Sequence, residues 1–468
     1  MQIKMADRDT IAFRLRDTFG AKSVRAGLDI SSDYGHDETL QMEPVLPAAV
    51  FAPTNAIQVA SAIQIACELG IPVTARGAGT GLSGACVPCP GGLVITFERM
   101  SSIREIDVDG HIAIVEPGVT LAELDAVAAE HDLIYPVFPG TNAATIGGNA
   151  ATNAGGMRAV KYGVTRRHVL GLEAVTGAGD VIRTGGRFVK SSTGYDLTQL
   201  LLGSEGTLAL ITQATLQLHP RLLHSASILA PFAVVDEVTA VIPKIVGSGV
   251  QPLILEYIDR STMSGLARMG RLTLGIPQAV ADCTEAYLVI VLEARDSSRL
   301  ETDISDVATQ LAEGGAHDVY VLPPGQGADL LTARESAFWM VKAAGADELI
   351  DMVVPRQKIP DYLREVQAIA DQHRSKVFGC GHAGDGNIHF SVYQPDAKKR
   401  SSLLTAIFEM GVGMGGAISG EHGIGRAKRS YFEQIEDPVK VALQRQIKGV
   451  FDPHGILNPG CIFQPVLN

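Results

Sequence analysis

Three side chains in the C-terminal half have the types and spacing of metal ligands. His382 and His389 lie on either side of a glycine turn, and Glu421 lies in a second glycine-rich segment further along the chain. Two neutral imidazoles and one carboxylate leave coordination positions open, as catalytic divalent-metal sites do. If opposed strand ends bring both rings together, these residues form a site that suits Zn²⁺, Mn²⁺ or Fe²⁺. The alternative is that the imidazoles are hydrogen-bonded core residues without a ligand.

A third imidazole, His422, follows the glutamate directly and is the candidate general base. A 2-hydroxy acid chelates a divalent metal through its hydroxyl and one carboxylate oxygen, which lowers the pKa of the hydroxyl. An adjacent histidine can then remove the hydroxyl proton while a hydride leaves C2 for a cofactor. The planar fork of Arg334 suits a substrate carboxylate. The alternative for Arg334 is a position on a helix surface, paired with Glu335 or Asp329.

A glycine-rich loop nearer the N-terminus indicates phosphate binding without a Rossmann turn. Gly79, Gly81 and Gly84 spell G-x-G-x-x-G after an apolar strand predicted at Ile71 to Ala75. A Rossmann site needs a helix directly after the turn, whereas prolines and glycines follow here. The backbone N–H groups of the loop remain open to a pyrophosphate, because glycine places no side chain in the way. A glycine-rich turn with no ligand is the alternative.

Two further segments carry small, amide or hydroxyl side chains that suit close approach to a flat heterocycle. The first runs from residue 139 to 156 and the second from residue 203 to 207. Glu205, in the second segment, is placed to accept hydrogen bonds from hydroxyl or amide donors. Taken alone, that segment is equally consistent with a structural hairpin.

The pattern around these segments predicts two domains. Val59, Ile63 and Cys67 have helical spacing and predict an amphipathic helix over Ala56 to Gly70. We predict further strands and helices on both sides of Pro220: strands at Leu93 to Phe97, Ile112 to Val115, Leu208 to Leu218, Leu253 to Ile258 and Ala286 to Glu293, and helices near Asp303 to Gly314 and Ile359 to His373. The longer alternation after Pro220 is typical of a second α+β domain.

The composition describes a globular chain of more than one domain. Apolar residues make up 46% of the 468 residues and charged residues only 19%, which excludes disordered, collagenous and coiled-coil proteins. The net charge of −12 excludes a general attraction to nucleic acid or anionic lipid. Met1 to Arg16 lacks the apolar core of a signal peptide, and no apolar run is long enough to span a bilayer. We therefore expect a cytoplasmic protein, free or peripheral at the membrane, with no transmembrane segment.

Three segments, Pro72 to Val87, Phe138 to Gly163 and Leu202 to Ala214, resemble the flavin-binding domain of the vanillyl-alcohol oxidase and p-cresol methylhydroxylase superfamily. The C-terminal half resembles the cap domain of FAD-linked D-2-hydroxy-acid dehydrogenases, of the D-lactate dehydrogenase and glycolate oxidase D subunit type. Together the two resemblances cover nearly the whole chain and imply FAD as the cofactor. The glycine loop lacks the histidine that some relatives link to flavin, so we expect non-covalent FAD.

The resemblance implies a fold of the α+β class. It has a two-subdomain FAD-binding domain of the p-cresol methylhydroxylase type and an α+β cap domain with an antiparallel sheet. We expect a helical segment at 1–44, the FAD-binding domain at 45–220, the cap domain at 221–435, and a C-terminal segment at 436–468 that returns to the FAD-binding domain. The expected cofactor contacts are Arg76, Gly77, Gly79, Thr80, Gly81, Ser83, Pro139, Gly140, Thr141, Thr145, Gly148, Asn149, Asn153, Gly155, Gly163, Glu205, Gly206, Ile211 and Asn458.

The resemblance also implies an activity, the oxidation of a short D-2-hydroxy acid by hydride transfer to flavin N5 with His422 as base. The implied metal ligands, for Zn or Mn, are His382, His389 and Glu421. Arg334 and Asn387 match residues that contact the substrate in the family.

The choice of acid is inferred from one position. Relatives specific for 2-hydroxyglutarate carry a lysine where Leu349 stands here, so we favour D-lactate over glycolate and D-2-hydroxyglutarate. Two other functions stay open: a flavin oxidase of a sugar or aldonolactone without metal, and a flavoprotein subunit that only passes electrons. The electron acceptor, whether quinone, cytochrome or electron-transferring flavoprotein, leaves no signature, and a homodimer is compatible with the sequence.

Overall fold

The N-terminal part of the chain forms a small layered unit. The structure, a computed structural model, describes residues 8–465. Helices α1 (Arg8–Phe19) and α2 (Ala56–Leu69) share an apolar core with a four-stranded sheet. The strand order of this sheet is β1 (Val24–Ala26), β2 (Ala49–Phe51), β4 (Leu93–Thr96) and β3 (Val73–Arg76).

Local signals in the sequence explain the start and end of α2. The side chain of Asn55 accepts a hydrogen bond from the backbone N–H of Gln58, and Gly70 ends the helix with a φ of 64°. The strands β3 and β4 pair in parallel, and no helix lies between them. Both results confirm the sequence prediction, including the departure from a Rossmann turn.

A second sheet of five antiparallel strands completes the FAD-binding part. Its order is β5 (Ile103–Asp107), β6 (Ile112–Val115), β10 (Ala209–Gln217), β8 (Val169–Thr176) and β9 (Val181–Gly185). Helices α3 (Leu121–Ala129) and α4 (Ile146–Thr152) contribute to the same core. The shorter elements nearby are α5 (Ala159–Tyr162), α6 (Leu197–Leu201) and the pair β7 (Leu133–Ile134) and β11 (His219–Pro220).

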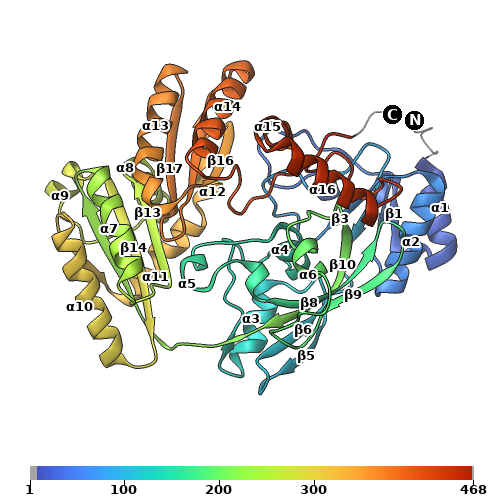
Figure 1. Ribbon diagram of the computed structural model, residues 1–468, viewed down its shortest axis with the longest axis horizontal. Coiled ribbons are helices and arrows are strands. Elements are labelled where there is room, and N and C mark those ends of the chain that lie inside the picture. Colours follow the sequence, from blue (N-terminus) through green and yellow to red (C-terminus); the bar gives the residue numbers. More distant parts are fainter. Residues whose placement is uncertain (1–7, 466–468) are drawn as a thin grey trace.

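The cap domain is one antiparallel sheet of seven strands with helices on both faces (Figure 1). The strand order is β15 (Tyr320–Leu322), β12 (His224–Phe232), β14 (Ala286–Ala294), β13 (Ile254–Asp259), β17 (Lys376–His382), β18 (Asn387–Tyr393) and β16 (Glu348–Val353). The large core lies on one face, under α7 (Val235–Gly247), α10 (Ser297–Glu313), α13 (Ile359–Gln372) and α14 (Ala397–Gly413). The other face is covered only in part, by α8 (Arg260–Gly270), α11 (Pro324–Glu335) and α12 (Ala337–Ala343). The short helix α9 (Gln278–Cys283) lies near β12.

The end of the described chain lies against the FAD-binding part, where α15 (Arg429–Ile435) and α16 (Pro438–Phe451) are drawn in red (Figure 1). Leu457 pairs in parallel with Val73 of β3. Two backbone hydrogen bonds fix this pairing, from Val73 to Ile456 at 2.8 Å and from Asn458 to Val73 at 2.7 Å. Residues 456–458 thus add to the first sheet.

Two local expectations differ from the structure. The segment 1–44, expected to be helical, is helical within the described residues only as far as Phe19, apart from short 3₁₀ turns. Positive φ angles at Gly20 and Gly27 interrupt the helix, and β1 then pairs with β2. Within the segment 139–156, where no helix was predicted, residues 146 to 152 form α4 because the Thr145 hydroxyl caps its first turn. No helix among residues 8–465 has the length and apolar character needed to cross a membrane.

Candidate active site

One face of the cap sheet carries both histidines of the predicted metal site. In the β17–β18 hairpin, Cys380 pairs with His389 and His382 pairs with Asn387. Because alternate residues of a strand point to the same face, His382 and His389 emerge on one side, in neighbouring rows. Residues of the opposite face pack into the core under α13 and α14. The hairpin therefore brings the two imidazoles together, as predicted.

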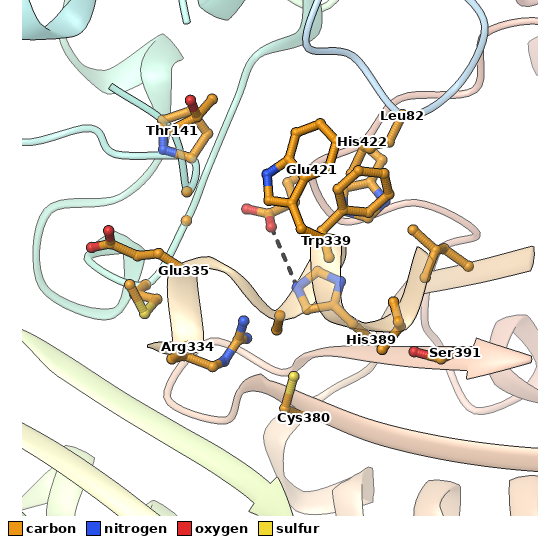
Figure 2. Close-up of a pocket in the computed structure, with 18 of the residues that line it drawn as sticks. Leu82, Thr141, Arg334, Glu335, Trp339, Cys380, His389, Ser391, Glu421 and His422 are labelled. Carbon is orange, nitrogen blue, oxygen red and sulfur yellow. Dashed lines mark ion pairs between the residues drawn. The ribbon is translucent and has the colours of Figure 1, made fainter. Parts of the chain in front are cut away.

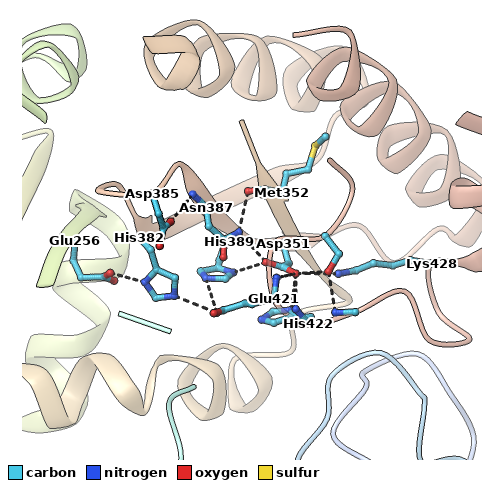
Figure 3. Close-up of polar contacts among 12 residues, drawn as sticks. Glu256, Asp351, Met352, His382, Asp385, Asn387, His389, Glu421, His422 and Lys428 are labelled. Carbon is cyan, nitrogen blue, oxygen red and sulfur yellow. Dashed lines mark hydrogen bonds and ion pairs between the residues drawn. The ribbon is translucent and has the colours of Figure 1, made fainter. Parts of the chain in front are cut away.

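Glu421 reaches the same point from a segment that follows the edge of the sheet. Residues 417–420 run beside β16, and the next residue turns inward. Oε1 of Glu421 lies 3.1 Å from Nε2 of His382 and 3.3 Å from Nε2 of His389 (Figure 3). A Cβ atom on Gly155 would lie 2.7 Å from the other carboxylate oxygen, so only glycine leaves room for the glutamate.

The three predicted ligands fit a divalent ion by their geometry. One donor atom from each of His382, His389 and Glu421 lies within 4.8 Å of the other two. Two imidazole nitrogens and one carboxylate oxygen that face one point are the donor set of an open metal site. Asp351, His389 and His422 form a second group within the same distance. The Asp351 carboxylate in that group is already occupied by hydrogen bonds to the chain, so the first group fits a metal better.

Two buried carboxylates lie behind the histidines, and one of them, Glu256, holds its ring by a hydrogen bond. Glu256 Oε1 lies 2.5 Å from Nδ1 of His382, and Asp351 Oδ1 lies 3.5 Å from Nδ1 of His389. A carboxylate that accepts from one ring nitrogen leaves the other available to a metal and raises its basicity. Burial alone would raise the pKa of Glu256, but His382 and Arg334 hold it at about 2. Neither acid was predicted to stand behind a ligand; their signal in the sequence is a carboxylate inside an apolar strand.

Asp351 also positions the candidate base. Its Oδ2 accepts hydrogen bonds from the backbone N–H groups of Glu421 at 3.1 Å and His422 at 2.8 Å, and from the Ser419 hydroxyl at 2.6 Å. Nζ of the buried Lys428 lies 3.6 Å from the same oxygen. Burial would raise the pKa of Asp351, but the positive charge around it keeps this pKa below the ordinary range. The carboxylate is therefore ionised and locks the backbone of the 419–422 turn.

His422 stands beside the metal ligands as a neutral imidazole. Its ring stacks on His389, with centroids 5.1 Å apart and planes 13° apart. Nδ1 lies 3.9 Å from Oδ2 of Asp351. Burial lowers the pKa of His422 to about 4, although Asp351 opposes the shift. Near neutral pH the ring therefore carries no charge and has a nitrogen free to accept a proton.

Arg334 enters the site from the last turn of α11. Its Nη2 lies 2.7 Å from Oε2 of Glu256, and its side chain is 11% exposed. Arg334 is thus buried beside the metal ligands, and it does not form the surface ion pair with Glu335 or Asp329 that we considered. A guanidinium has five N–H donors, so the contact with Glu256 leaves others free for a ligand.

The structure gives Asn387 a supporting position where a substrate contact was expected. Its amide nitrogen donates to Oδ1 of Asp351 at 2.8 Å and to the carbonyl of Met352 at 3.0 Å. The side chain is buried under the ligands and does not line the cavity. Asn387 therefore fixes Asp351, and both amide protons are already used.

A cavity of about 160 Å³ opens in front of these groups (Figure 2). Its wall includes His382, His389, Glu421, His422 and Arg334. Residues of the glycine loop and of segment 139–141 close the side that faces the FAD-binding domain. The remaining wall comes from α12 and from the sheet face and is mostly apolar.

The cavity continues into a groove across the FAD-binding domain. Two further cavities in this domain share wall residues with each other. One of them also shares Glu421 and His422 with the active-site cavity. The expected cofactor residues on these walls are Gly77, Gly79, Thr80, Gly81, Ser83, Pro139, Gly140, Thr141, Thr145, Gly148, Asn149, Glu205, Gly206 and Ile211. The three cavities thus lead from the metal ligands into the FAD-binding domain through shared wall residues.

Two features of the groove fit FAD. A Cβ atom on Gly77 would lie 2.3 Å from the hydroxyl of Thr145, so a side chain does not fit here and the backbone of Gly77 faces the groove directly. The amide nitrogen of Asn149 is buried and has no hydrogen-bond partner within residues 8–465. A buried donor without a partner is rare in proteins and indicates a ligand acceptor. The glycine loop would hold the pyrophosphate, and the active-site end would hold the isoalloxazine ring.

Five expected cofactor residues lie outside the groove walls. The Arg76 guanidinium donates to the carbonyl of His36 at 2.6 Å. Asn153 ends α4 with a φ of 52°, and Gly163 ends α5 with a φ of 81°. Gly155 makes room for Glu421, as described above. The Asn458 amide donates to the carbonyls of Ala85 and Glu205 and so ties two groove loops together.

Glu205 lines the groove, but its carboxylate binds the chain. Oε1 accepts from the backbone N–H of Ile424 and Oε2 accepts from that of Gly425, both at 2.8 Å. Burial raises the pKa of Glu205, and these two hydrogen bonds oppose the shift. Glu205 thus joins the groove to the segment that carries His422, where we had expected a contact to a ligand.

Comparison with known families and proteins identifies both parts of the chain. The model for an FAD binding domain matches residues 47–185, and the model for the C-terminal domain of FAD linked oxidases matches residues 223–462. The structure superposes on p-cresol methylhydroxylase with a TM-score of 0.81 at 16% sequence identity, covering 98% of this chain and 97% of that chain. The predicted fold class, with its antiparallel cap sheet, is therefore confirmed.

Three relatives match over nearly their whole length. An uncharacterised FAD-linked oxidoreductase of Mycobacterium tuberculosis is 52% identical, covering 96% of this chain and 98% of its own. A D-lactate dehydrogenase of Archaeoglobus fulgidus is 38% identical, covering 92% and 95%. The glycolate oxidase subunit GlcD of Bacillus subtilis is 35% identical, covering 92% of each chain. The chain therefore belongs to the FAD-linked oxidoreductase family that includes D-lactate dehydrogenases and the glycolate oxidase D subunit.

Proposed function

We propose that this protein oxidises a D-2-hydroxy monocarboxylic acid to the 2-oxo acid, with FAD and a divalent metal, and that D-lactate is a substrate. One observation carries the proposal: Arg334, His422 and the triad of His382, His389 and Glu421 line one cavity that opens into the FAD groove. A carboxylate, a hydroxyl and a C2 hydrogen lie on two adjacent carbons of such an acid, so one small cavity can address all three.

Each side chain has a distinct role toward that substrate. Arg334 binds the carboxylate through N–H groups that Glu256 leaves free. His422, held by Asp351, accepts the hydroxyl proton at a ring nitrogen because its imidazole is neutral. When bound, the metal polarises the substrate hydroxyl and the flavin takes up the two electrons of the oxidation.

The D-lactate dehydrogenase and glycolate oxidase relatives support a hydroxy-acid substrate over a sugar. The geometry of His382, His389 and Glu421 supports the same choice, because a 2-hydroxy acid can chelate a divalent ion held by these three residues. For the metal we propose Zn²⁺ or Mn²⁺, which suit two imidazoles and a carboxylate.

Anaerobic titration of the purified holoprotein with D-lactate and L-lactate tests the proposal. We expect D-lactate to bleach the flavin absorbance and L-lactate to leave it unchanged. Loss of bleaching after treatment with a chelator, and its return with Zn²⁺ or Mn²⁺, would support the metal assignment. A flavoprotein that no 2-hydroxy acid reduces would instead be a subunit that only passes electrons, and the proposal would be wrong.

A further inference from the structure

The sheet face that holds the metal ligands continues into an apolar row. Ser391 of β18 pairs with Leu349 of β16 on one side and with Phe378 of β17 on the other. These three residues share the face of His389 and lie two positions further along their strands, which is about 7 Å. All three line the active-site cavity. One hydroxyl and two hydrocarbon side chains therefore line the space next to the metal ligands.

The wall across from this row is apolar as well. Phe338 of α12 lines the cavity. Figure 2 shows Trp339 of α12 and Leu82 of the glycine loop on the same cavity wall. Trp339 is 53% exposed, and its ring packs edge-on against Phe338 with centroids 5.0 Å apart. Apolar surface on both walls favours a ligand that fills the space between them with hydrocarbon.

Charge on the wall disfavours a second anionic group at this end. Arg334 is the one Lys or Arg among the described residues that line the cavity. Lys342 on α12 does not line the cavity, and its Nζ is already paired with Glu38 at 2.6 Å and lies 5.3 Å from the ring centre of Trp339. Glu335 lies on the cavity wall. A distal carboxylate would lose water against hydrocarbon and would face this acid.

We infer that the preferred substrate is a D-2-hydroxy acid whose C2 substituent is a branched or aromatic hydrocarbon, such as isobutyl or benzyl, seated between Leu349, Phe378, Phe338 and Trp339. This inference rests on the proposed function and specifies its substrate class. A methyl group, as in lactate, leaves the Leu349 row uncovered, and a carboxyethyl group places an unpaired anion there. The cavity wall therefore favours substrates that carry a bulky apolar group beyond C3.

Flavin reduction by three D-acids tests the inference: lactate, 2-hydroxy-4-methylpentanoate and 2-hydroxyglutarate. We expect kcat/KM for 2-hydroxy-4-methylpentanoate to exceed that for lactate by about tenfold or more, and that for 2-hydroxyglutarate by a larger factor. Equal or faster reduction by lactate or 2-hydroxyglutarate would overturn the inference and leave the proposed function standing. If none of the acids reduced the flavin, both would fail.

A pair of leucine-to-lysine variants tests the row itself. Leu349→Lys should lower kcat/KM for the methylpentanoate by about tenfold or more and raise it for 2-hydroxyglutarate. Leu443→Lys, the same change at an exposed position of α16, should leave the ratio unchanged. FAD absorbance reports whether each variant folds. If Leu349→Lys loses FAD, Leu349→Ala replaces it and should bring the ratio of methylpentanoate to lactate closer to one. An unchanged ratio in the folded Leu349 variant would overturn the inference.

Discussion

Asp351 fixes the backbone of His422 and lies beside its ring: its Oδ2 accepts the backbone N–H of His422 at 2.8 Å and lies 3.9 Å from Nδ1 of the ring. Asp351→Asn would replace this acceptor by an amide that cannot serve all of its present donors. We expect flavin reduction to slow by about 10-fold to 100-fold, with weaker metal binding. Stopped-flow absorbance and metal analysis measure both effects. Asp371→Asn, at an exposed site on α13, is the matched control, and equal behaviour of the two variants would contradict the role.

Removal of the candidate base should separate chemistry from binding. His422→Gln keeps a polar side chain but has no proton acceptor of comparable basicity. We expect the rate of flavin reduction to fall by about 10²-fold to 10⁴-fold, with FAD and metal retained. Reduction at the parent rate would show that another group takes the proton.

Substitution of a metal ligand should have a different effect from substitution of the base. Glu421→Gln removes the carboxylate that faces both imidazole Nε2 atoms. We expect this variant to lose its metal while its flavin spectrum stays normal, because glutamine has nearly the same shape as glutamate. Elemental analysis after dialysis is the measurement. A variant that retained a full equivalent of metal would place the ion elsewhere.

The glycine loop gives a test of the cofactor groove. A methyl group at Gly77 would lie 2.3 Å from the Thr145 hydroxyl, whereas one at Gly449 meets nothing within 4 Å. Gly77→Ala should therefore weaken FAD binding by about tenfold or more, since overpacking of this kind costs about 1–3 kcal/mol. Gly449→Ala should have no effect on FAD content, which absorbance measures. Full FAD occupancy in Gly77→Ala would contradict the assignment of the loop.

A buried histidine pair predicts acid sensitivity. His168 Nδ1 lies 3.2 Å from Nε2 of His219, and burial lowers the pKa of His168 from 6.5 to about 4. The unfolded chain binds a proton at His168 below about pH 6.5, but the folded chain binds it only near pH 4. Stability that is present above this window is therefore lost as the pH falls through it, by up to about 3 kcal/mol.

The variant His168→Gln tests this sensitivity. It has no titrating ring, so urea unfolding should show a smaller loss of stability between about pH 7 and pH 5 than in the parent protein. An identical loss in both proteins would assign the acid sensitivity to other groups.

The sequence predicts the histidine ligands because their signal is local. A short hairpin joins His382 to His389, and alternation along its strands puts both rings on one face. Glu256 and Asp351 lie far from the histidines in sequence, and only the pairing of β13 with β17 and of β16 with β18 brings them near. The sequence shows these carboxylates, but it does not show which strands become neighbours.

Asn387 and Glu205 show a second limit of sequence reasoning. Both occupy the expected region, yet their polar atoms bind Asp351 and the backbone of residues 424–425. A residue type indicates which hydrogen bonds a side chain can make, but the partner depends on distances of a few tenths of an ångström. The roles of individual polar residues therefore became clear only from the structure, whereas the fold and the cofactor groove could be predicted from the sequence.

The pairing of Leu457 with Val73 has a consequence for biogenesis. Chains emerge from the ribosome N-terminus first, and β3 is made long before its last partner strand is available. The strand that leads into the glycine loop thus gains this neighbour only after residues 456–458 have been translated. A nascent chain that stalled before this point would lack one support of the cofactor groove.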